Sequence, residues 1–379
     1  MEFKVKKVDL LKALQRFLTI VGKTGCIQIF SCLLIEAKEN RVSLSGTNSE
    51  LGIICNLKAE IFSDGKIAIF YKNFYELVRE LPEGDISFLL DNSSNRIALK
   101  SSLKGKFSLA VLAPDNFPLP EIAEDELFKV RVNTNSLKDI IRKTYFAIYD
   151  SSNKKHEEQR PIPKGSLWII ENSIIKVVAT DGHRLAYAEN KIDISEEIEL
   201  KFIIPKKSIL ELKKIVEEDD AQVISIGLKE NHIFFKQKDV IFFSRLLEGE
   251  FKDYSKYVPK DNIYQVRVNK NNLYSVIKRV SIFSSEELKG IKLALSSNKL
   301  TVISPSSELG EAIEEIDIEY SLGDLTAKIN FIYLLNVLDC IDSDEVLIEL
   351  RDHHSAILFK DKNDENYKWV VLPMQLEKS

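Results

Sequence analysis

One segment of the sequence occurs three times, and this repetition constrains the fold more than any other feature. The copies are FKVKKVDLLKALQRFLTIV from Phe3, VRVNTNSLKDIIRKTYFAI from Val130 and VRVNKNNLYSVIKRVSIFS from Val266. Each copy begins with the alternating apolar pattern of a strand and continues with the three-to-four-residue spacing of an amphipathic helix. Agreement in this detail indicates one strand-to-helix unit that recurs in each third of the chain.

Equivalent positions of the three copies are apolar, and we expect them to form the cores. The predicted core positions are Phe3, Val5, Leu10 and Leu14, then Val130, Val132, Leu137 and Ile141, then Val266, Val268, Leu273 and Ile277. Polar residues that accept hydrogen bonds from the first N–H groups of a helix stand between the two patterns. They predict where each helix begins: Asp9, Asn135 with Ser136, and Asn271 with Asn272.

A second helical pattern also recurs, in FYKNFYELVRELPEG from Phe70, PKKSILELKKIVEED from Pro205 and NFIYLLNVLDCIDSD from Asn330. Short alternating runs such as RVSLSGT, HIFFKQK and VLIELRD predict antiparallel strands around the helices. The sequence therefore predicts an α+β protein of three repeated domains, each with two helices packed on antiparallel sheets. Linkers that begin at Ala113 and Glu248 place these domains at 1–125, 126–258 and 259–379.

Composition narrows the class of protein. Of the 379 residues, 44% are hydrophobic and 29% are charged, which is typical of a soluble globular protein. No apolar run approaches the roughly 20 residues of a membrane span, and the N-terminus lacks the apolar core of a signal peptide, so we expect a cytoplasmic protein. The four cysteines, Cys26, Cys32, Cys55 and Cys340, lack the spacing of a metal clip or redox pair, so we expect buried free thiols.

Positive charge recurs on the helices, although a net charge of −5 argues against a nucleic-acid-binding protein. A single exposed lysine usually does no more than interact with solvent. The repeat, however, aligns Arg16 with Lys143 and Arg279, and simple solvation does not explain a cation at the same position of every copy. If the units close into a ring with these helices inside, the cations converge on a channel that binds a phosphate backbone without reading sequence. The predicted DNA-contacting set is Lys12, Arg16, Lys23, Lys72, Arg79, Lys143, Lys207, Lys214 and Arg279.

Motifs for catalysis and metal binding are weak. His183 beside Asp181 leaves a hydrolase as the alternative function, but no Ser or Cys nucleophile motif accompanies the pair. His353 and His354 are neighbours in an expected strand, where they point to opposite faces and cannot bind one metal. We therefore expect no catalytic residue, no metal and no cofactor.

The segments VVATDGHRLAYAENK, IIPKKSILELKK and LLEGEFKDYSKYVPK, with the ending WVVLPMQL, resemble the bacterial DNA sliding clamp, the beta subunit of DNA polymerase III. The resemblance runs the whole length of the chain. It implies a non-enzymatic processivity factor of DNA replication, in which two three-domain subunits join head to tail in a ring that encircles duplex DNA and tethers the polymerase. A head-to-tail contact that closes on itself gives a ring instead of a fibre.

In that family, the polymerase and clamp-loader subunits insert a linear peptide into an apolar cleft between the second and third domains. The resemblance places His183 and Arg184 at the rim, where they would bind peptide carbonyls, and leucine and methionine make such a slot deformable. Pro163, Lys252 and Gln375 depart from the family pattern and leave the peptide preference open, with Lys252 favouring acidic flanking residues. The matching cleft residues are Thr180, Gly182, His183, Arg184, Leu185, Val370, Leu372, Pro373 and Met374.

The resemblance also implies a subunit contact that joins the first domain of one copy to the third domain of the other. Exposed ion pairs contribute under about 1 kcal/mol each, so we expect apolar residues to hold the ring shut and charges to set its orientation. Phe107 and Leu109 on an edge strand would meet Ile282 and Phe283, and Lys104 and Lys106 would meet Glu308, Glu311 and Glu314. Whether the segment from Tyr149 to Gly165 contacts DNA stays open.

Overall fold

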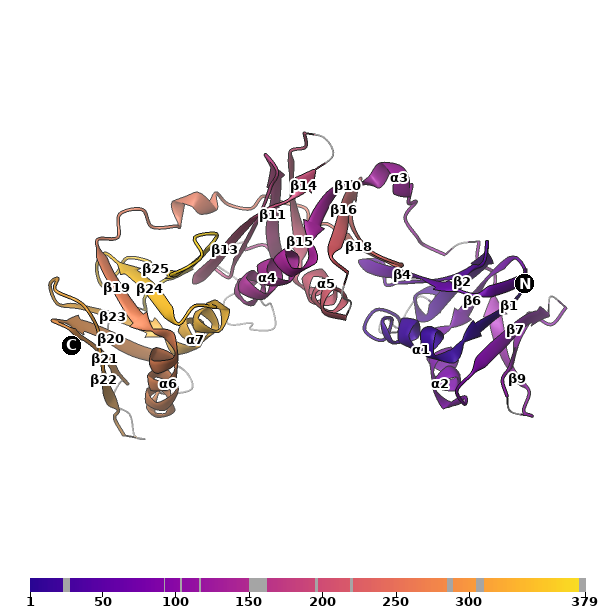
Figure 1. The fold of residues 1–379 in the computed structure, drawn as a ribbon, viewed down its shortest axis with the longest axis horizontal. Helices are drawn as coiled ribbons and strands as arrows, with labels where there is room; N and C mark the ends of the chain where they lie inside the picture. Colours follow the sequence, from indigo (N-terminus) through magenta and orange to yellow (C-terminus); the bar gives the residue numbers. More distant parts are fainter. Residues whose placement is uncertain are drawn as a thin grey trace. The chain divides into compact units, whose positions relative to one another are not determined.

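The computed structural model of the protein (Figure 1) describes residues 1–22, 28–91, 93–102, 104–115, 117–149, 162–194, 197–218, 221–284, 289–304 and 310–374. The chain forms two compact units. One unit contains Met1–Thr134 and Asp219–Leu246, and the other contains Asn135–Glu218 and Leu247–Ser379. Within the described ranges, none of the helices has the length and apolar character needed to cross a membrane.

The first unit is built on a continuous antiparallel sheet. Its strands follow the order β10-β16-β17-β18-β4-β3-β2-β6-β9-β8-β7-β1-β5. The paired helices α1 and α2 contact each other (Figure 1). The helical elements are α1 (Lys7–Gln15), η1 (Gln28–Ser31), α2 (Tyr71–Glu80) and α3 (Glu124–Leu127). The strands are β1 (Glu2–Lys6), β2 (Cys32–Lys38), β3 (Arg41–Thr47), β4 (Leu51–Lys58), β5 (Glu60–Ser63), β6 (Gly65–Phe70), β7 (Asp85–Asp91), β8 (Arg96–Lys100), β9 (Phe107–Leu112), β10 (Phe128–Asn133), β16 (Val223–Lys229), β17 (His232–Gln237) and β18 (Val240–Arg245).

The second unit contains two antiparallel sheets, with the strand orders β15-β11-β12-β13-β26-β25-β24-β19 and β22-β21-β20-β23. Its helical elements are α4 (Thr134–Thr144), η2 (Tyr145–Ala147), α5 (Lys206–Glu218), η4 (Tyr254–Lys256), α6 (Lys270–Val280), η5 (Ser281–Phe283) and α7 (Phe331–Cys340). The strands are β11 (Gly165–Glu171), β12 (Ile174–Thr180), β13 (Arg184–Lys191), β14 (Asp193–Ile194), β15 (Leu200–Pro205), β19 (Tyr264–Asn269), β20 (Gly290–Ser296), β21 (Lys299–Ile303), β22 (Ile313–Asp317), β23 (Leu325–Asn330), β24 (Glu345–Leu350), β25 (Ile357–Asp361) and β26 (Tyr367–Val371).

The predicted core is confirmed in all three copies of the repeat. Each of the twelve aligned apolar positions is 3% exposed or less. The second helices also bury one apolar face each, and Leu77 on α2 is only half-buried. Cys32, Cys55 and Cys340 are buried free thiols as expected, whereas Cys26 lies outside the described residues. The α+β fold class and the two main helices of each third therefore match the prediction.

The predicted helix starts are wrong, because strand passes into helix without a loop. Asp9 lies inside the first turn of α1, and Asn269 caps α6 by accepting from the backbone N–H of Asn272. The first N–H of a helix donates instead to the carbonyl that precedes a neighbouring strand. These N···O distances are 2.9 Å for Lys7 to Gly84, 3.0 Å for Thr134 to Gln222, 2.9 Å for Lys206 to Lys164, 2.8 Å for Lys270 to Asp344 and 2.9 Å for Phe331 to Lys289.

The sheets continue from one third of the sequence into the next. In the first unit β18 pairs with β4, and Phe243 lies opposite Gly52. A Cβ on Gly52 would lie 2.3 Å from the Phe243 ring, so this position requires glycine. In the second unit β13 pairs with β26. The compact units therefore cut across the repeats, and the boundaries at Asp125 and Val258 stay a prediction.

A buried lysine links the two helices of the first third, and its counterpart does so in the last third. The Lys7 ammonium donates to the carbonyl of Leu81 at the C-terminus of α2, and the Lys270 ammonium donates to Ile341 after α7 at 2.9 Å. The last carbonyls of a helix lack helical partners and attract cations. In the middle third Thr134 takes this place, and its Oγ1 has no hydrogen-bond partner among the described residues.

Replacing Lys7 with methionine should lower the free energy of unfolding by about 1–3 kcal/mol, because the buried Leu81 carbonyl loses a charged donor. Urea unfolding followed by circular dichroism measures this change. Lys6→Met is the matched control, since Lys6 is exposed, and it should leave the midpoint unchanged. Thr134→Val should have the opposite sign to Lys7→Met, because it removes an unpaired buried hydroxyl. Equal midpoints for Lys7→Met and Lys6→Met would contradict the proposed link.

Candidate functional site

The turn between β12 and β13 is held by its own polar side chains. Asp181 Oδ1 accepts from the backbone N–H groups of His183 and Arg184, both at 3.0 Å. Thr180 Oγ1 donates to the Arg184 carbonyl at 2.7 Å and accepts from Gly182 N–H at 3.1 Å. Gly182 has φ +86°, and a Cβ there would lie 2.6 Å from Ile162. The TDGHR segment therefore specifies a tight turn of defined shape.

The chain's last described segment lies beside this turn. Leu185 pairs with Val370 and Arg184 with Val371 in the β13–β26 ladder. The pairing extends past the strand, because Leu372 N–H donates to the His183 carbonyl at 2.8 Å. The two motifs TDGHRLA and VVLPM, far apart in sequence, are thus neighbours in one sheet.

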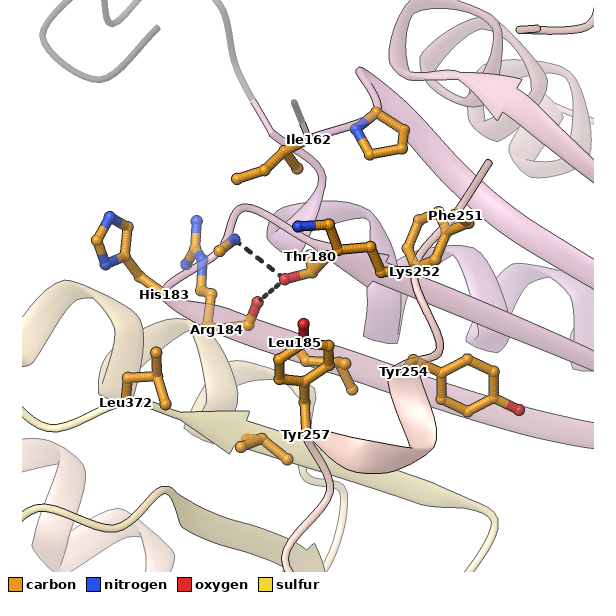
Figure 2. A pocket seen from close by; sticks show the side chains of 13 residues that line it. Ile162, Thr180, His183, Arg184, Leu185, Phe251, Lys252, Tyr254, Tyr257 and Leu372 are labelled. Atoms are coloured by element: carbon orange, nitrogen blue, oxygen red, sulfur yellow. Dashed lines mark hydrogen bonds between the residues drawn. The ribbon is translucent and has the colours of Figure 1, made fainter. Parts of the chain in front are cut away.

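A cavity of about 280 Å³ opens between this turn, the end of β26 and the segment before β19 (Figure 2). Leu185 and Val370 are buried beneath it, and Phe251 joins them in one apolar cluster. Tyr257 and Leu372 at its mouth are 54% and 42% exposed, so part of their hydrophobic surface is accessible to a ligand. Its lining residues are Ile162, Pro163, Thr180, Gly182, His183, Arg184, Leu185, Phe251, Lys252, Tyr254, Tyr257, Val370 and Leu372.

The Arg184 guanidinium lines the cavity and also has partners within its own chain. Its Nε donates to Asp181 Oδ2 at 2.9 Å and its Nη2 donates to the Phe146 carbonyl at 2.8 Å. The guanidinium carbon lies 5.1 Å from the centre of the Phe146 ring and 4.3 Å from that of Tyr333. Arg184 therefore helps to join η2, the turn and α7, because its guanidinium lies over both rings. That it binds peptide carbonyls stays a prediction.

Two of the nine predicted cleft residues do not line the cavity. Pro373 is half-buried beyond Leu372, and Met374 N–H donates to the Lys328 carbonyl at 2.7 Å. The Met374 sulfur lies beside Gly290, so this side chain packs on the smaller sheet of the unit. Gln375 lies outside the described residues. Sequence reasoning missed the apolar wall formed by Ile162, Phe251, Tyr254 and Tyr257. Ile162 lies in the segment from Tyr149 to Gly165, and the other three lie in the linker that begins at Glu248.

The geometry does not favour the hydrolase alternative. Both Asp181 oxygens accept from the turn backbone and from Arg184, so this carboxylate orients the turn. The expected strand at His353 and His354 is wrong: the two residues lie in a bend, with ring centres 4.0 Å apart. Across the part of the chain that the structure describes, no group of three His, Cys, Asp or Glu side chains is arranged to hold a metal.

The predicted DNA-contacting residues have different environments. Lys12, Lys72 and Lys207 are exposed on α1, α2 and α5, and Arg16 is half-buried at the end of α1. Lys23 lies outside the described residues. The other exposed members have acidic neighbours in the chain: Arg79 pairs with Glu80 at 3.0 Å, Lys214 with Glu211 at 2.9 Å and Arg279 with Glu314 at 2.6 Å.

Lys143 is the clear error in that set, because it is buried. Only 3% of it is exposed, and its ammonium lies 2.8 Å from Asp342 Oδ2 and 3.7 Å from the centre of the Tyr367 ring. Arg142 binds both oxygens of the same carboxylate at 2.8 Å. Burial acts to raise the pKa of Asp342, but the hydrogen bonds from Lys143 and Arg142 outweigh it and hold the pKa below its usual value. The repeat aligned Lys143 with Arg16 correctly but did not reveal this acidic neighbour.

The residues predicted for a subunit contact lie on two surfaces. Phe107 and Leu109 are half-buried on β9, which pairs with β8 through Phe107–Ala110 and with β6 only through Val111 and Leu112. Ile282 in η5 is 69% exposed. Phe283 is half-buried, Lys104, Lys106 and Glu311 are exposed, and Glu308 lies outside the described residues. Glu314 accepts from Arg279 of its own chain, which lowers its pKa.

Family models of the DNA polymerase III beta subunit match the chain in three consecutive segments. The N-terminal domain matches residues 1–122, the central domain 131–253 and the C-terminal domain 255–375. The beta sliding clamp of Bacillus subtilis is 30% identical over 387 residues, which cover 99% of this chain and 100% of the relative.

Solved structures agree over the same length. The DNA polymerase sliding clamp of Bacillus subtilis has a TM-score of 0.90 at 30% identity and covers 99% of both chains. The DNA polymerase III subunit beta of Pseudomonas aeruginosa has a TM-score of 0.90 at 28% identity, over 99% of this chain and 100% of the other. With its repeated strand-to-helix units and all three domains matched, the chain belongs to the DNA polymerase III beta subunit family, the beta sliding clamps.

Proposed function

We propose that this protein is a replication sliding clamp, a processivity subunit without a catalytic centre of its own that encircles duplex DNA in the cytoplasm and tethers the polymerase. The observation that carries this proposal is the full-length likeness to solved sliding clamps at a TM-score of 0.90. Three domains, at 1–125, 126–258 and 259–379, would form one half of the ring. A ring holds DNA by topology, so it requires no base contacts and is free to slide.

The cavity beside the β12–β13 turn is the proposed tether point. Its floor is apolar and its mouth exposes Tyr257 and Leu372, which suits a few side chains of an extended peptide. Polymerase and clamp-loader subunits would compete for it through such segments. Pro373 and Met374 remain candidates only if the last described segment moves when the peptide binds.

The proposed subunit contact joins β9 of one copy to η5 and β22 of another. Over Phe107–Ala110, β9 has a partner strand on one side only within the described ranges, so this edge is open to pairing. Ile282 adds an apolar residue that is mostly exposed in the single chain. Lys104 and Lys106 would face Glu311, whereas Glu314 already has Arg279 as a partner.

The combined substitution Phe107→Asp and Ile282→Asp should convert the particle from twice the chain mass of 43.3 kDa to a monomer at micromolar concentration. Two buried carboxylates without partners would make the contact unfavourable. Light scattering measures the mass. The same variant should lose retention on covalently closed circular DNA while it still binds a polymerase peptide, because the cleft lies elsewhere.

Ile263→Asp is the matched control, since Ile263 is 67% exposed and lies in the linker before β19. It should keep the doubled mass. A wild-type particle that is monomeric at micromolar concentration would remove the proposed ring, and a doubled mass in the double variant would remove this assignment of the contact.

A further inference from the structure

The charges that line the cleft are unevenly compensated. Arg184 is paired with Asp181, whose Oδ2 accepts from the guanidinium while its Oδ1 accepts from the turn backbone. Lys252 also lines the cleft, and it is exposed. Unlike Arg184, it makes no ion pair or hydrogen bond with the rest of the chain as far as the structure describes it.

The acidic residue next to Lys252 is unavailable to it. Asp253 Oδ1 accepts from the backbone and hydroxyl of Ser255 at 3.1 and 2.7 Å, and its Oδ2 lies 3.6 Å from Lys256. These hydrogen bonds lower the pKa of Asp253, so it stays ionised but committed to the start of η4. Lys252 is therefore the one lining cation, among the residues described, without a carboxylate of its own.

The direction of the side chain points to a role in the cleft. In Figure 2 Lys252 extends from the Phe251 side of the cavity toward the side formed by Thr180 and Ile162. An occupant that fills the apolar floor would remove water from around this ammonium. Loss of that water makes an unpaired ammonium energetically unfavourable, and it strengthens the attraction between the ammonium and a carboxylate of the occupant.

We propose that Lys252 makes the cleft selective for peptide segments that carry an aspartate or glutamate side chain directly beside their apolar anchor residue. This inference rests on the proposed function of the cleft as a peptide site. An apolar anchor would lie over Leu185 and Val370, and the adjacent carboxylate would accept from the Lys252 ammonium. A lysine or arginine at the same peptide position would be disfavoured by the same charge.

The test uses the full-length protein and the cleft-binding peptide of the replicative polymerase from the same genome, labelled with fluorescein and amidated at its C-terminus. Amidation removes the terminal carboxylate, so only side chains supply negative charge. Versions of the peptide carry Asp, Asn or Lys at each position that flanks the apolar anchor. Fluorescence anisotropy gives the dissociation constants.

Wild-type protein should bind the best Asp peptide about tenfold more tightly than its Asn counterpart, as expected for a partly exposed charge-assisted hydrogen bond. In Lys252→Gln this ratio should fall to about one, and in Lys252→Glu the Lys peptide should become the preferred one. Lys256→Gln is the control: Lys256 is four residues away, is paired with Asp253 and does not line the cavity, so the ratio should persist.

The outcomes separate this inference from the function on which it rests. An unchanged Asp-to-Asn ratio in Lys252→Gln, with all peptides bound, would overturn the role of Lys252 and leave the cleft intact as a peptide site. Absence of binding by the unmodified polymerase peptide to wild-type protein would overturn both. A ratio lost equally in Lys252→Gln and Lys256→Gln would mean that general surface charge, and not this side chain, selects the peptide.

Discussion

Replacing Lys143 with glutamate should lower the free energy of unfolding of the second unit by about 3–5 kcal/mol, the cost of leaving a buried charge without its partner. The new carboxylate would face the Asp342 carboxylate and the π face of Tyr367, where the ammonium now lies 2.8 and 3.7 Å from its neighbours. Trp369 reports on this region, because its indole N–H donates to the Lys143 carbonyl at 2.9 Å. Urea unfolding followed by Trp369 fluorescence in a Trp168→Phe background measures the change.

Two further variants distinguish burial of charge from loss of charge. Lys143→Met keeps most of the side-chain volume, and Arg142 still binds Asp342, so we expect a loss of under about 1.5 kcal/mol. Lys138→Glu reverses a charge on the same helix four residues before Arg142, where a glutamate is well placed, and it should be close to neutral. A neutral Lys143→Glu variant would contradict the buried position of Lys143.

Reversing Lys12, Lys72 and Lys207 together to glutamate should strongly weaken binding to short linear duplex DNA at moderate salt, while leaving it measurable at low salt. These lysines are exposed on three of the repeated helices, so they remain the best candidates for phosphate contacts. The slope of log K against log salt is negative, and each lost phosphate contact should reduce its magnitude by about 1. Two copies of the chain in a ring would double this reduction. Fluorescence anisotropy at several salt concentrations gives this slope.

Lys58, Lys100 and Lys201 supply the matched control, because they are also exposed but lie on strands. Their triple reversal changes the net charge equally and should leave the salt slope nearly unchanged. Both triple variants should retain the doubled particle mass. If the two sets weaken DNA binding equally, net charge is responsible, and the repeated helix faces have no special role.

Periodicity predicted the core well because burial follows from spacing alone. Phe3, Leu14, Ile141 and Ile277 are buried where the repeat placed them. The helix starts could not be predicted this way, since the first N–H of Lys7 or Lys270 is satisfied by a carbonyl that lies far away in sequence. A helix can therefore begin without a local cap where a neighbouring strand already supplies an acceptor for its first N–H.

In the candidate site, too, features set by local sequence were predicted and contacts between distant segments were not. The turn from Thr180 to Leu185 contains its own hydrogen-bond partners, so its shape depends on local sequence, and the family resemblance predicted its place in the cleft. Lys143 failed because its partner, Asp342, belongs to a different repeat. Tyr254 and Tyr257 were missed because they line the cavity from a linker whose sequence has no strand or helix periodicity. Side-chain neighbours from distant segments are the information that repeat alignment lacks.

The β4–β18 ladder has a consequence for how such a chain can be divided. Leu51 to Cys55 are hydrogen-bonded to strand residues Val240 to Ser244, which follow them by almost two hundred positions. A gene fragment ending near Asp125 would therefore encode a protein in which the edge of β4 is exposed, with unpaired backbone N–H and C=O groups. Such an edge can pair with other chains and promote aggregation. A single repeat is therefore a poor unit for domain exchange or fusion. A fragment that contains the first hundred residues should also contain β16, β17 and β18.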